Sequence, residues 1–249
     1  MDVAFPIRAW NPDRLKRLSA YCFFLVMLAM LVSVPCHSAE IRGRVSMRYT
    51  GLFKADASIT DVPVSVALLP VDGRKIDLAK PKVVQVEVTG NRIIPAFLSL
   101  QTGDAVEFVN RDGVFHQLFS VSPEGPFNVT LAKFDGKNRV ATKVEFDKPG
   151  TMHVFCRIHN RSYARIDVLD TPYQQMVQSG EAFRFADIPA GRWTLRLASP
   201  GAETRLVDVD ALTLPPSLSL ELHSLSGGSG HGALSSQFVV ERLYDAGSE

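Results

Sequence analysis

The chain has 249 residues, of which 27 are basic and 26 acidic, so its formal net charge is +1. A charge this balanced excludes the basic surface that nucleic-acid binding requires. Hydrophobic residues make up 46% of the chain, three residues are cysteine, and there is neither a collagen-like period nor a long polar tract. The composition therefore indicates a globular protein of one or two domains and excludes a disulfide scaffold.

The N-terminal residues 1–39 have the pattern of an export signal peptide. Four basic residues, the last of them Arg17, precede an apolar run over 18–34, and small residues follow at Ser38 and Ala39. The run is shorter than the about 20 residues that a membrane-spanning helix needs. We expect cleavage after Ala39 or Ser38, or else retention as an anchor, the one case in which the protein would contact a membrane. In either case we expect the rest of the chain in the periplasm.

Alternating apolar and polar residues dominate the rest of the chain, and no segment has a convincing helical period. Turn signals such as Asp72-Gly73, Asp135-Gly136 and Pro149-Gly150 separate many of the alternating segments. The expected strands are 41–47, 62–68, 84–88, 97–100, 106–108, 115–121, 127–131, 140–146, 152–156, 163–168, 182–185, 193–197, 206–209 and 218–222. Short strands at this spacing predict an all-β protein built as antiparallel sandwiches.

The expected strands divide the exported chain into three folded parts and a tail. Residues 40–80 hold two expected strands and residues 171–224 hold four, too few in each case to bury a good core alone. We expect these two parts to pair into one small sandwich, with residues 81–170 inserted between them. The alternative is two sequential domains, 81–170 and 171–224, with residues 40–80 as an N-terminal extension of the first. Residues 225–249 begin near a Gly-Ser run and are expected to form a flexible tail.

Cys156 is the residue on which the chemistry of the chain centres. Cys22 and Cys36 lie in the leader, so Cys156 has no intramolecular cysteine partner after export. A free thiol in an oxidising compartment is expected to be buried, catalytic or bound to a metal. His159 follows in Cys-x2-His spacing, and His116 lies upstream where a neighbouring strand could present it. One thiolate and two imidazoles form the donor set that suits copper in a trigonal site.

Residues 95–173 resemble the cupredoxins, the blue copper proteins, and most closely the periplasmic cupredoxin-like proteins labelled methylamine utilization proteins. The matching motifs occur in the family's order: Pro95 to Asn110, Asn110-Arg111-Asp112 with His116, Phe119-Ser120, Phe146 to Gly150, Cys156-x2-His159 and Asp170 to Tyr173. The resemblance implies a Greek-key cupredoxin sandwich over 81–170 and one type 1-like copper ion held by His116, Cys156 and His159. It implies no catalytic residues, so we expect the protein not to be an enzyme.

The axial position of the implied copper site departs from the family. Its members place a methionine three residues after the second histidine, where this chain has Ser162. Met152 lies four residues before Cys156 on the same expected strand, about 13 Å away at 3.3 Å per residue, and Met176 lies beyond the domain exit. The site is therefore three-coordinate, or uses a carbonyl, a water or the Ser162 hydroxyl, or has lost copper.

A second resemblance covers part of residues 171–224. Ser179 to Phe185, followed by Ile188 to Leu195, is similar to the carboxypeptidase regulatory-domain-like fold, a small Ig- or transthyretin-like β-sandwich. This match implies a fold and carries no chemistry.

Three functions follow from these observations as alternatives. The first is a cupredoxin-like protein that passes single electrons to an unknown periplasmic redox protein or holds copper for delivery. The second is a non-catalytic binding or scaffold protein with a degenerate metal site. The third, a Cys156 nucleophile with a histidine base, lacks a visible orienting acid or oxyanion motif. His153, His223 and His231 are expected outside the site, His153 because strand parity points it away from Cys156.

Overall fold

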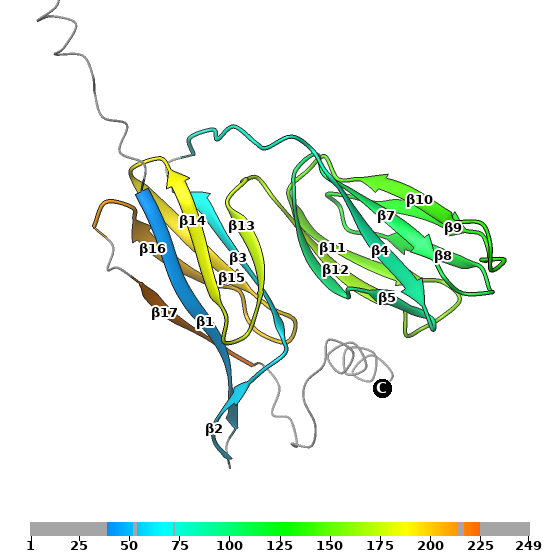
Figure 1. Cartoon of the computed structure of the whole chain (residues 1–249), viewed down its shortest axis with the longest axis horizontal. Coiled ribbons are helices and arrows are strands. Elements are labelled where there is room, and N and C mark those ends of the chain that lie inside the picture. Colours follow the sequence, from blue (N-terminus) through cyan, green and yellow to red (C-terminus); the bar gives the residue numbers. More distant parts are fainter. Residues whose placement is uncertain (1–38, 52–53, 72, 214–216, 225–249) are drawn as a thin grey trace, which may run out of the picture. The chain divides into compact units, whose positions relative to one another are not determined.

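The structure is a computed structural model that describes residues 39–51, 54–71, 73–213 and 217–224, with side chains of 49–57 left aside. These ranges contain seventeen β-strands and no helix (Figure 1), which confirms the predicted all-β class. Within them, no helix is long and apolar enough to span a membrane. Residues 1–38 of the expected leader and the expected tail 225–249, with His231, lie outside the described residues.

One sandwich combines strands from both ends of the described chain and is named the flanking sandwich. One of its sheets has the order β14-β1-β17 with β2 paired to β1, and the other has the order β13-β3-β15-β16. The pairs β1–β14 and β3–β15 join the two strand-poor segments 40–80 and 171–224. Its strands are β1 (Ala39–Gly51), β2 (Lys54–Ile59), β3 (Pro63–Pro70), β13 (Gln174–Gln178), β14 (Ala182–Ile188), β15 (Arg192–Ala198), β16 (Arg205–Asp210) and β17 (Leu218–His223).

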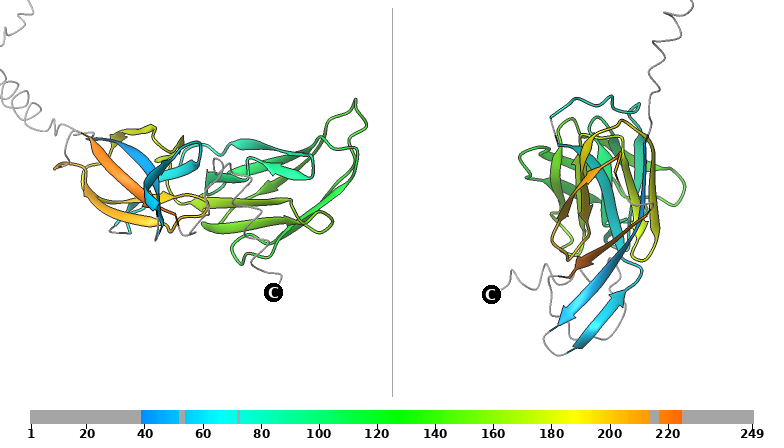
Figure 2. Two further views of the ribbon diagram at one scale, coloured as in Figure 1. Left: turned by 90° about the horizontal axis from the view of Figure 1, so that it is seen from below. Right: turned by 90° about the vertical axis from the view of Figure 1, so that its left-hand side faces the viewer.

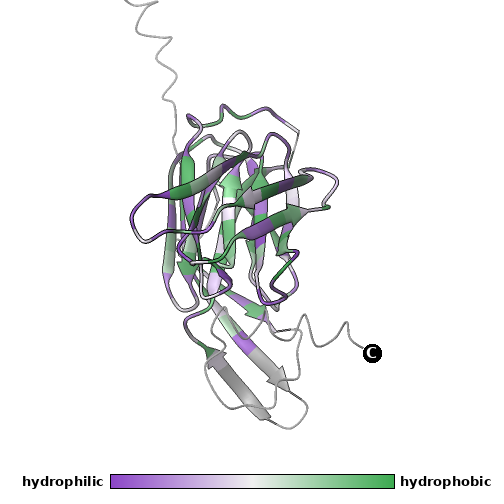
Figure 3. Cartoon of the chain, turned by 90° about the vertical axis from the view of Figure 1, so that its right-hand side faces the viewer, coloured by the Kyte–Doolittle hydropathy of each residue, from purple (hydrophilic) through white to green (hydrophobic). Residues whose placement is uncertain are grey.

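Strand β1 is hydrogen-bonded on both sides, and its sequence accounts for this. Gly43, Val45 and Met47 are buried on the side of β1 that faces the core of the flanking sandwich. Arg44, which lies between Gly43 and Val45 in the sequence, is exposed. Figure 3 shows hydrophobic and hydrophilic positions alternating along strands of the described chain. A Cβ added at Gly43 would lie 2.6 Å from the carbonyl oxygen of Leu218. The close approach of β17 therefore requires glycine at this position.

The strands between β3 and β13 form the central sandwich, which carries the candidate site. Its two sheets have the orders β10-β7-β4-β5 and β6-β12-β11-β8-β9, and Figure 2 shows them as separate layers. Fully buried side chains such as Phe108, Leu118 and Ile166 fill the space between the sheets. Its strands are β4 (Val83–Thr89), β5 (Arg92–Ile94), β6 (Phe97–Gln101), β7 (Ala105–Asn110), β8 (His116–Ser120), β9 (Phe127–Leu131), β10 (Val140–Glu145), β11 (Gly150–Cys156) and β12 (Tyr163–Leu169).

Two features of the strands differ from the prediction. The expectation of antiparallel pairing is wrong for three pairs, because β1–β17, β4–β7 and β6–β12 are parallel. Alternation has the same period of two in both kinds of sheet, so it does not report strand direction. The sequence also does not predict β2, β5 and β13. Strand β5 has three residues and β13 begins with two glutamines, so neither gives an apolar alternation.

Asp167 on β12 is fully buried and pairs with two arginines. Its carboxylate accepts hydrogen bonds from Nε and Nη2 of Arg165 at 2.8 and 2.9 Å and from Nη2 of Arg196 at 2.7 Å. Burial acts to raise the pKa of Asp167, but the hydrogen bonds and charges of the two arginines outweigh it and hold the pKa below its usual value. Because Arg196 belongs to β15, this ion pair joins the central sandwich to the flanking sandwich.

We expect Asp167→Asn to lower the free energy of unfolding at neutral pH by about 3 to 5 kcal/mol, because Arg196 loses its buried counter-charge. The folded-state pKa of Asp167 lies below its unfolded value. The contribution of the carboxylate is therefore present above about pH 4 and is lost as the pH falls through the folded-state pKa. Urea unfolding of both proteins across this pH range measures the difference.

The matched control is Glu107→Gln, which removes a half-buried carboxylate paired with the exposed Arg139 and should change the unfolding free energy much less than Asp167→Asn does. A difference between natural protein and Asp167→Asn that stays constant down to about pH 2 would contradict the prediction.

Candidate metal centre

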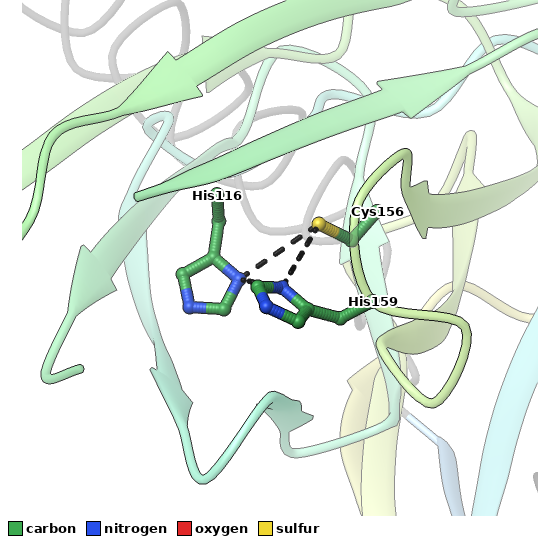
Figure 4. Close-up of side chains that lie close together, drawn as sticks. All are labelled: His116, Cys156 and His159. Atoms are coloured by element: carbon green, nitrogen blue, oxygen red, sulfur yellow. Dashed lines mark hydrogen bonds between the residues drawn. The ribbon is translucent and has the colours of Figure 1, made fainter. Parts of the chain in front are cut away.

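Three potential ligand atoms converge at one end of the central sandwich (Figure 4). His116 is the first residue of β8, Cys156 is the last residue of β11, and His159 lies in the loop between β11 and β12. The Cys156 Sγ lies 3.8 Å from His116 Nδ1 and 3.7 Å from His159 Nδ1, and the two Nδ1 atoms are 3.1 Å apart. The structure thus brings together all three residues that the sequence singles out as ligands.

The pairing of β8 with β11 explains how residues so far apart in sequence come together. The two strands are antiparallel, so the start of β8 lies beside the end of β11, and the N–H of Arg157 donates to the Gln117 carbonyl at 3.0 Å. The following loop is closed by two backbone hydrogen bonds of 3.1 Å, from Ser162 to His159 and from Cys156 to Ser162. This closure holds the His159 side chain beside Cys156.

The spacing of the three atoms fits a transition-metal ion. One point in their plane lies about 2 Å from each atom, close to the bond lengths of zinc to nitrogen and sulfur. His116 and Cys156 are buried and His159 is half-buried, so the point is shielded on the protein side and reachable past His159. A thiolate with two imidazoles therefore offers a preformed site for a soft or borderline metal.

Asp112 contacts the ring nitrogen of His116 that faces away from the cluster. The His116 Nε2 lies 3.0 Å from Oδ2 of Asp112. An ionised carboxylate only accepts hydrogen bonds, so Nε2 carries the ring proton and Nδ1 presents a lone pair toward Cys156. Burial lowers the pKa of His116 by more than the hydrogen bond to Asp112 raises it. The imidazole is therefore neutral near pH 7, the form that binds metals.

Ser162, the residue at the expected axial position, is fully buried, and its hydroxyl donates to the Asn91 carbonyl at 2.7 Å. The methionines of the described chain lie elsewhere. Met47 is in the core of the flanking sandwich, Met176 is on β13, and Met152 is four residues before Cys156 on β11. The Ser162 oxygen keeps its lone pairs, so its role as an axial ligand stays a prediction.

Two histidines predicted outside the site have other surroundings. The His153 Nδ1 lies 2.8 Å from the hydroxyl oxygen of Tyr163, and the two rings are stacked. His223 is exposed at the end of β17. The residues that sequence reasoning missed are Asp112 and Asn91. Asp112 belongs to the Asn-Arg-Asp motif, and a carboxylate four residues before a ligand histidine is the signal that could have found it.

The chain was compared with known proteins. No family model matches it, and no curated protein matches its sequence. Among solved structures, amicyanin from Paracoccus versutus is 16% identical, with 41% of this chain and 91% of that chain covered and a TM-score of 0.31. A mutant fern plastocyanin is 18% identical, with 34% and 100% covered and a TM-score of 0.30. A copper-containing nitrite reductase from Thermus scotoductus is 28% identical, with 39% and 24% covered and a TM-score of 0.30. With scores at this level, the geometry of the site has to support any function.

Replacing Ser162 by alanine is expected to lower the free energy of unfolding by about 1 to 3 kcal/mol, because the buried Asn91 contact loses its hydroxyl donor. Ser65→Ala is the matched control. Ser65 is also fully buried, but its hydroxyl has no hydrogen-bond partner within the described part of the chain, so its loss should not destabilise. Denaturant unfolding of both variants checks this, and an equal loss in the two would contradict the assigned role of the Ser162 hydroxyl.

Proposed function

We propose that this chain is a copper protein of the cupredoxin type that transfers single electrons. The observation that carries the proposal is the convergence of one sulfur and two nitrogens, 3.1 to 3.8 Å apart, from two paired strands and one loop. Structural zinc sites are usually tetrahedral with four protein ligands. One thiolate and two imidazoles, with any fourth ligand weak, are instead the donor set of electron-transfer copper sites.

The scaffold around the three side chains suits electron transfer. His116 and Cys156 lie on hydrogen-bonded strands, which hold ligands more accurately than mobile loops do. His159 is half-buried, and the exposed apolar residues Phe115 and Ile158 directly precede the two histidines, with exposed fractions of 55% and 45%. Apolar surface beside a ligand histidine favours docking of a redox protein at a short distance from the metal. Holding copper for delivery would use the same three ligands.

Further parts of the proposal rest on the sequence pattern alone. The basic and apolar segments of residues 1–39 support export to the periplasm. The ordered motifs between Pro95 and Tyr173 support a relationship with the methylamine utilization protein-like cupredoxins. The motifs after Ser179 support a carboxypeptidase regulatory-like flanking sandwich. The partner we propose is a periplasmic redox protein, and the chain acts as a carrier and not as an enzyme.

A second candidate function is a binding or scaffold protein that has kept the shape of the site without its metal. One observation favours it: Ser162 replaces the family's methionine, and its hydroxyl is engaged with Asn91. In that case the three side chains would be held by the same strand pairing and would bind no copper.

Copper titration separates the two candidates. We expect the purified protein to bind one copper ion and to develop intense visible absorption from thiolate-to-copper charge transfer, because Sγ and both Nδ1 atoms are already placed around one point. Cys156→Ser should abolish this absorption. His153→Ala removes a histidine from the same strand whose contact is Tyr163, so it should bind copper as the natural protein does. Natural protein without bound copper would refute the proposal and support the scaffold function.

Ser162→Met tests the axial position. If residue 162 faces the metal, the thioether donates electron density that stabilises Cu(II), and the reduction potential falls. Electrochemistry and the visible spectrum of the two proteins provide the measurement. A variant that folds, binds copper and keeps both the natural potential and spectrum would show that residue 162 faces away from the metal.

A further inference from the structure

The Asp112 carboxylate receives three N–H groups from two parts of the central sandwich. Its Oδ1 accepts from the backbone N–H of Gly90 at 2.7 Å, and its Oδ2 accepts from the backbone N–H of Asn91 at 3.0 Å and from His116 Nε2 at 3.0 Å. The side chain is 15% exposed, whereas the His116 side chain is fully buried. A carboxylate with this many donors is held firmly, and its charge is close to the imidazole.

The turn that binds Asp112 also contacts the second ligand-bearing loop. Gly90 and Asn91 form the two-residue connection between β4 and β5, and both have positive φ, at 57° and 60°. This conformation directs both N–H groups of the turn toward Asp112 and leaves the Asn91 carbonyl to accept from the Ser162 hydroxyl. One turn thus links the loop before His116 with the loop that follows His159.

The loop before His116 is braced at two further points. The N–H of Arg111 donates to the Val88 carbonyl at 2.8 Å, and the N–H of Asp112 donates to the Asn110 side-chain oxygen at 2.9 Å. Asn110 in turn donates its amide to the carbonyls of Val114 and Ala132. The position of the Asp112 carboxylate is therefore set by backbone contacts that do not involve the ligand cluster itself.

We propose that Asp112 is a positioning residue for the metal centre, one that fixes His116 with Nδ1 toward the metal and favours the oxidised metal through its charge. This rests on the proposed function, because copper is the metal whose charge changes. The carboxylate holds the ring proton on Nε2 and keeps the ring plane fixed. It also makes Nδ1 a more basic ligand, which donates its lone pair to the metal more strongly. A negative charge beside a ligand stabilises the more positive metal state.

Asparagine is the informative replacement, because it has nearly the same shape but one oxygen and one NH₂ group. Both carboxylate oxygens accept in the natural protein, so either orientation of the amide places an NH₂ group against an N–H. With NH₂ toward His116, the ring must accept at Nε2 and carry its proton on Nδ1, the nitrogen that faces Cys156. Asp112→Asn should therefore lose the single tautomer as well as the charge.

The first experiment uses the metal-free, full-length protein. Nitrogen-15 NMR of the His116 ring near pH 7.5 reports which nitrogen carries the proton. We expect only the Nε2–H tautomer in the natural protein and a partial shift to Nδ1–H in Asp112→Asn. Natural protein with the proton on Nδ1 would overturn the proposal without any variant, so the test survives a variant that fails to fold. The tautomer is measured without copper, so a failure of this experiment is distinguishable from a failure of the proposed function.

The second experiment measures the affinities for Cu(II) and Cu(I) and the reduction potential. Asp112→Asn should lower Cu(II) affinity about 10- to 100-fold and Cu(I) affinity by less, so that the potential rises. Glu107→Gln is the control with the same change of charge in the same sandwich, and its natural partner is Arg139, so it should alter neither affinity. Equal losses for the two oxidation states, with an unchanged potential, would reduce Asp112 to a structural role and overturn the proposal.

Discussion

When two antiparallel strands pair, the first residues of one strand lie beside the last residues of the other, and the candidate site depends on this constraint. Strand β8 begins with His116 at the same end of the sheet where β11 ends with Cys156. The short loop after β11 then needs only one turn to return His159 to the same point. Strand pairing in this way places two ligands by backbone hydrogen bonds, and the third follows from the loop closure.

The parts of the fold that could be predicted are those that a period of two reports. Alternation along segments such as 41–47 and 163–168 distinguishes strands from helices, and turn residues mark many of their ends. Residues 40–80 and 171–224 each contain too few expected strands to form a core alone, which predicts that the two segments pair. In the structure β1 pairs with β14 and β3 pairs with β15. Strand direction could not be predicted, because parallel and antiparallel neighbours impose the same alternation.

In the candidate site, too, some residues could be predicted from the sequence and others could not. Cys156, His159 and His116 could be identified because their side chains carry the chemistry and their spacing is visible in the chain. Asp112 and Asn91 act through hydrogen bonds to the backbone and to a ring nitrogen across a hairpin connection. The place of Asp112 four residues before His116 is a signal for the ring contact. The contacts of Asn91 and of the turn depend on which loop lies over which turn, and spacing does not report them. The same holds for Ser162. The sequence shows a serine at this position but does not show that its hydroxyl donates to the Asn91 carbonyl.

In the sequence, all strands of the central sandwich lie between β3 and β13 of the flanking sandwich. This order affects the entropy change when the flanking sandwich forms. Strands β3 and β13 must pair across the entire insertion, and closing a long disordered loop is slow and entropically costly. The central strands are contiguous, however, and their folding fixes both ends of the insertion at one turn. The N–H of Ala105 donates to the Lys82 carbonyl and the N–H of Thr102 donates to the Leu169 carbonyl. Once the inner domain has formed, its entry and exit points are held close together, and the outer domain closes as if joined by a short linker.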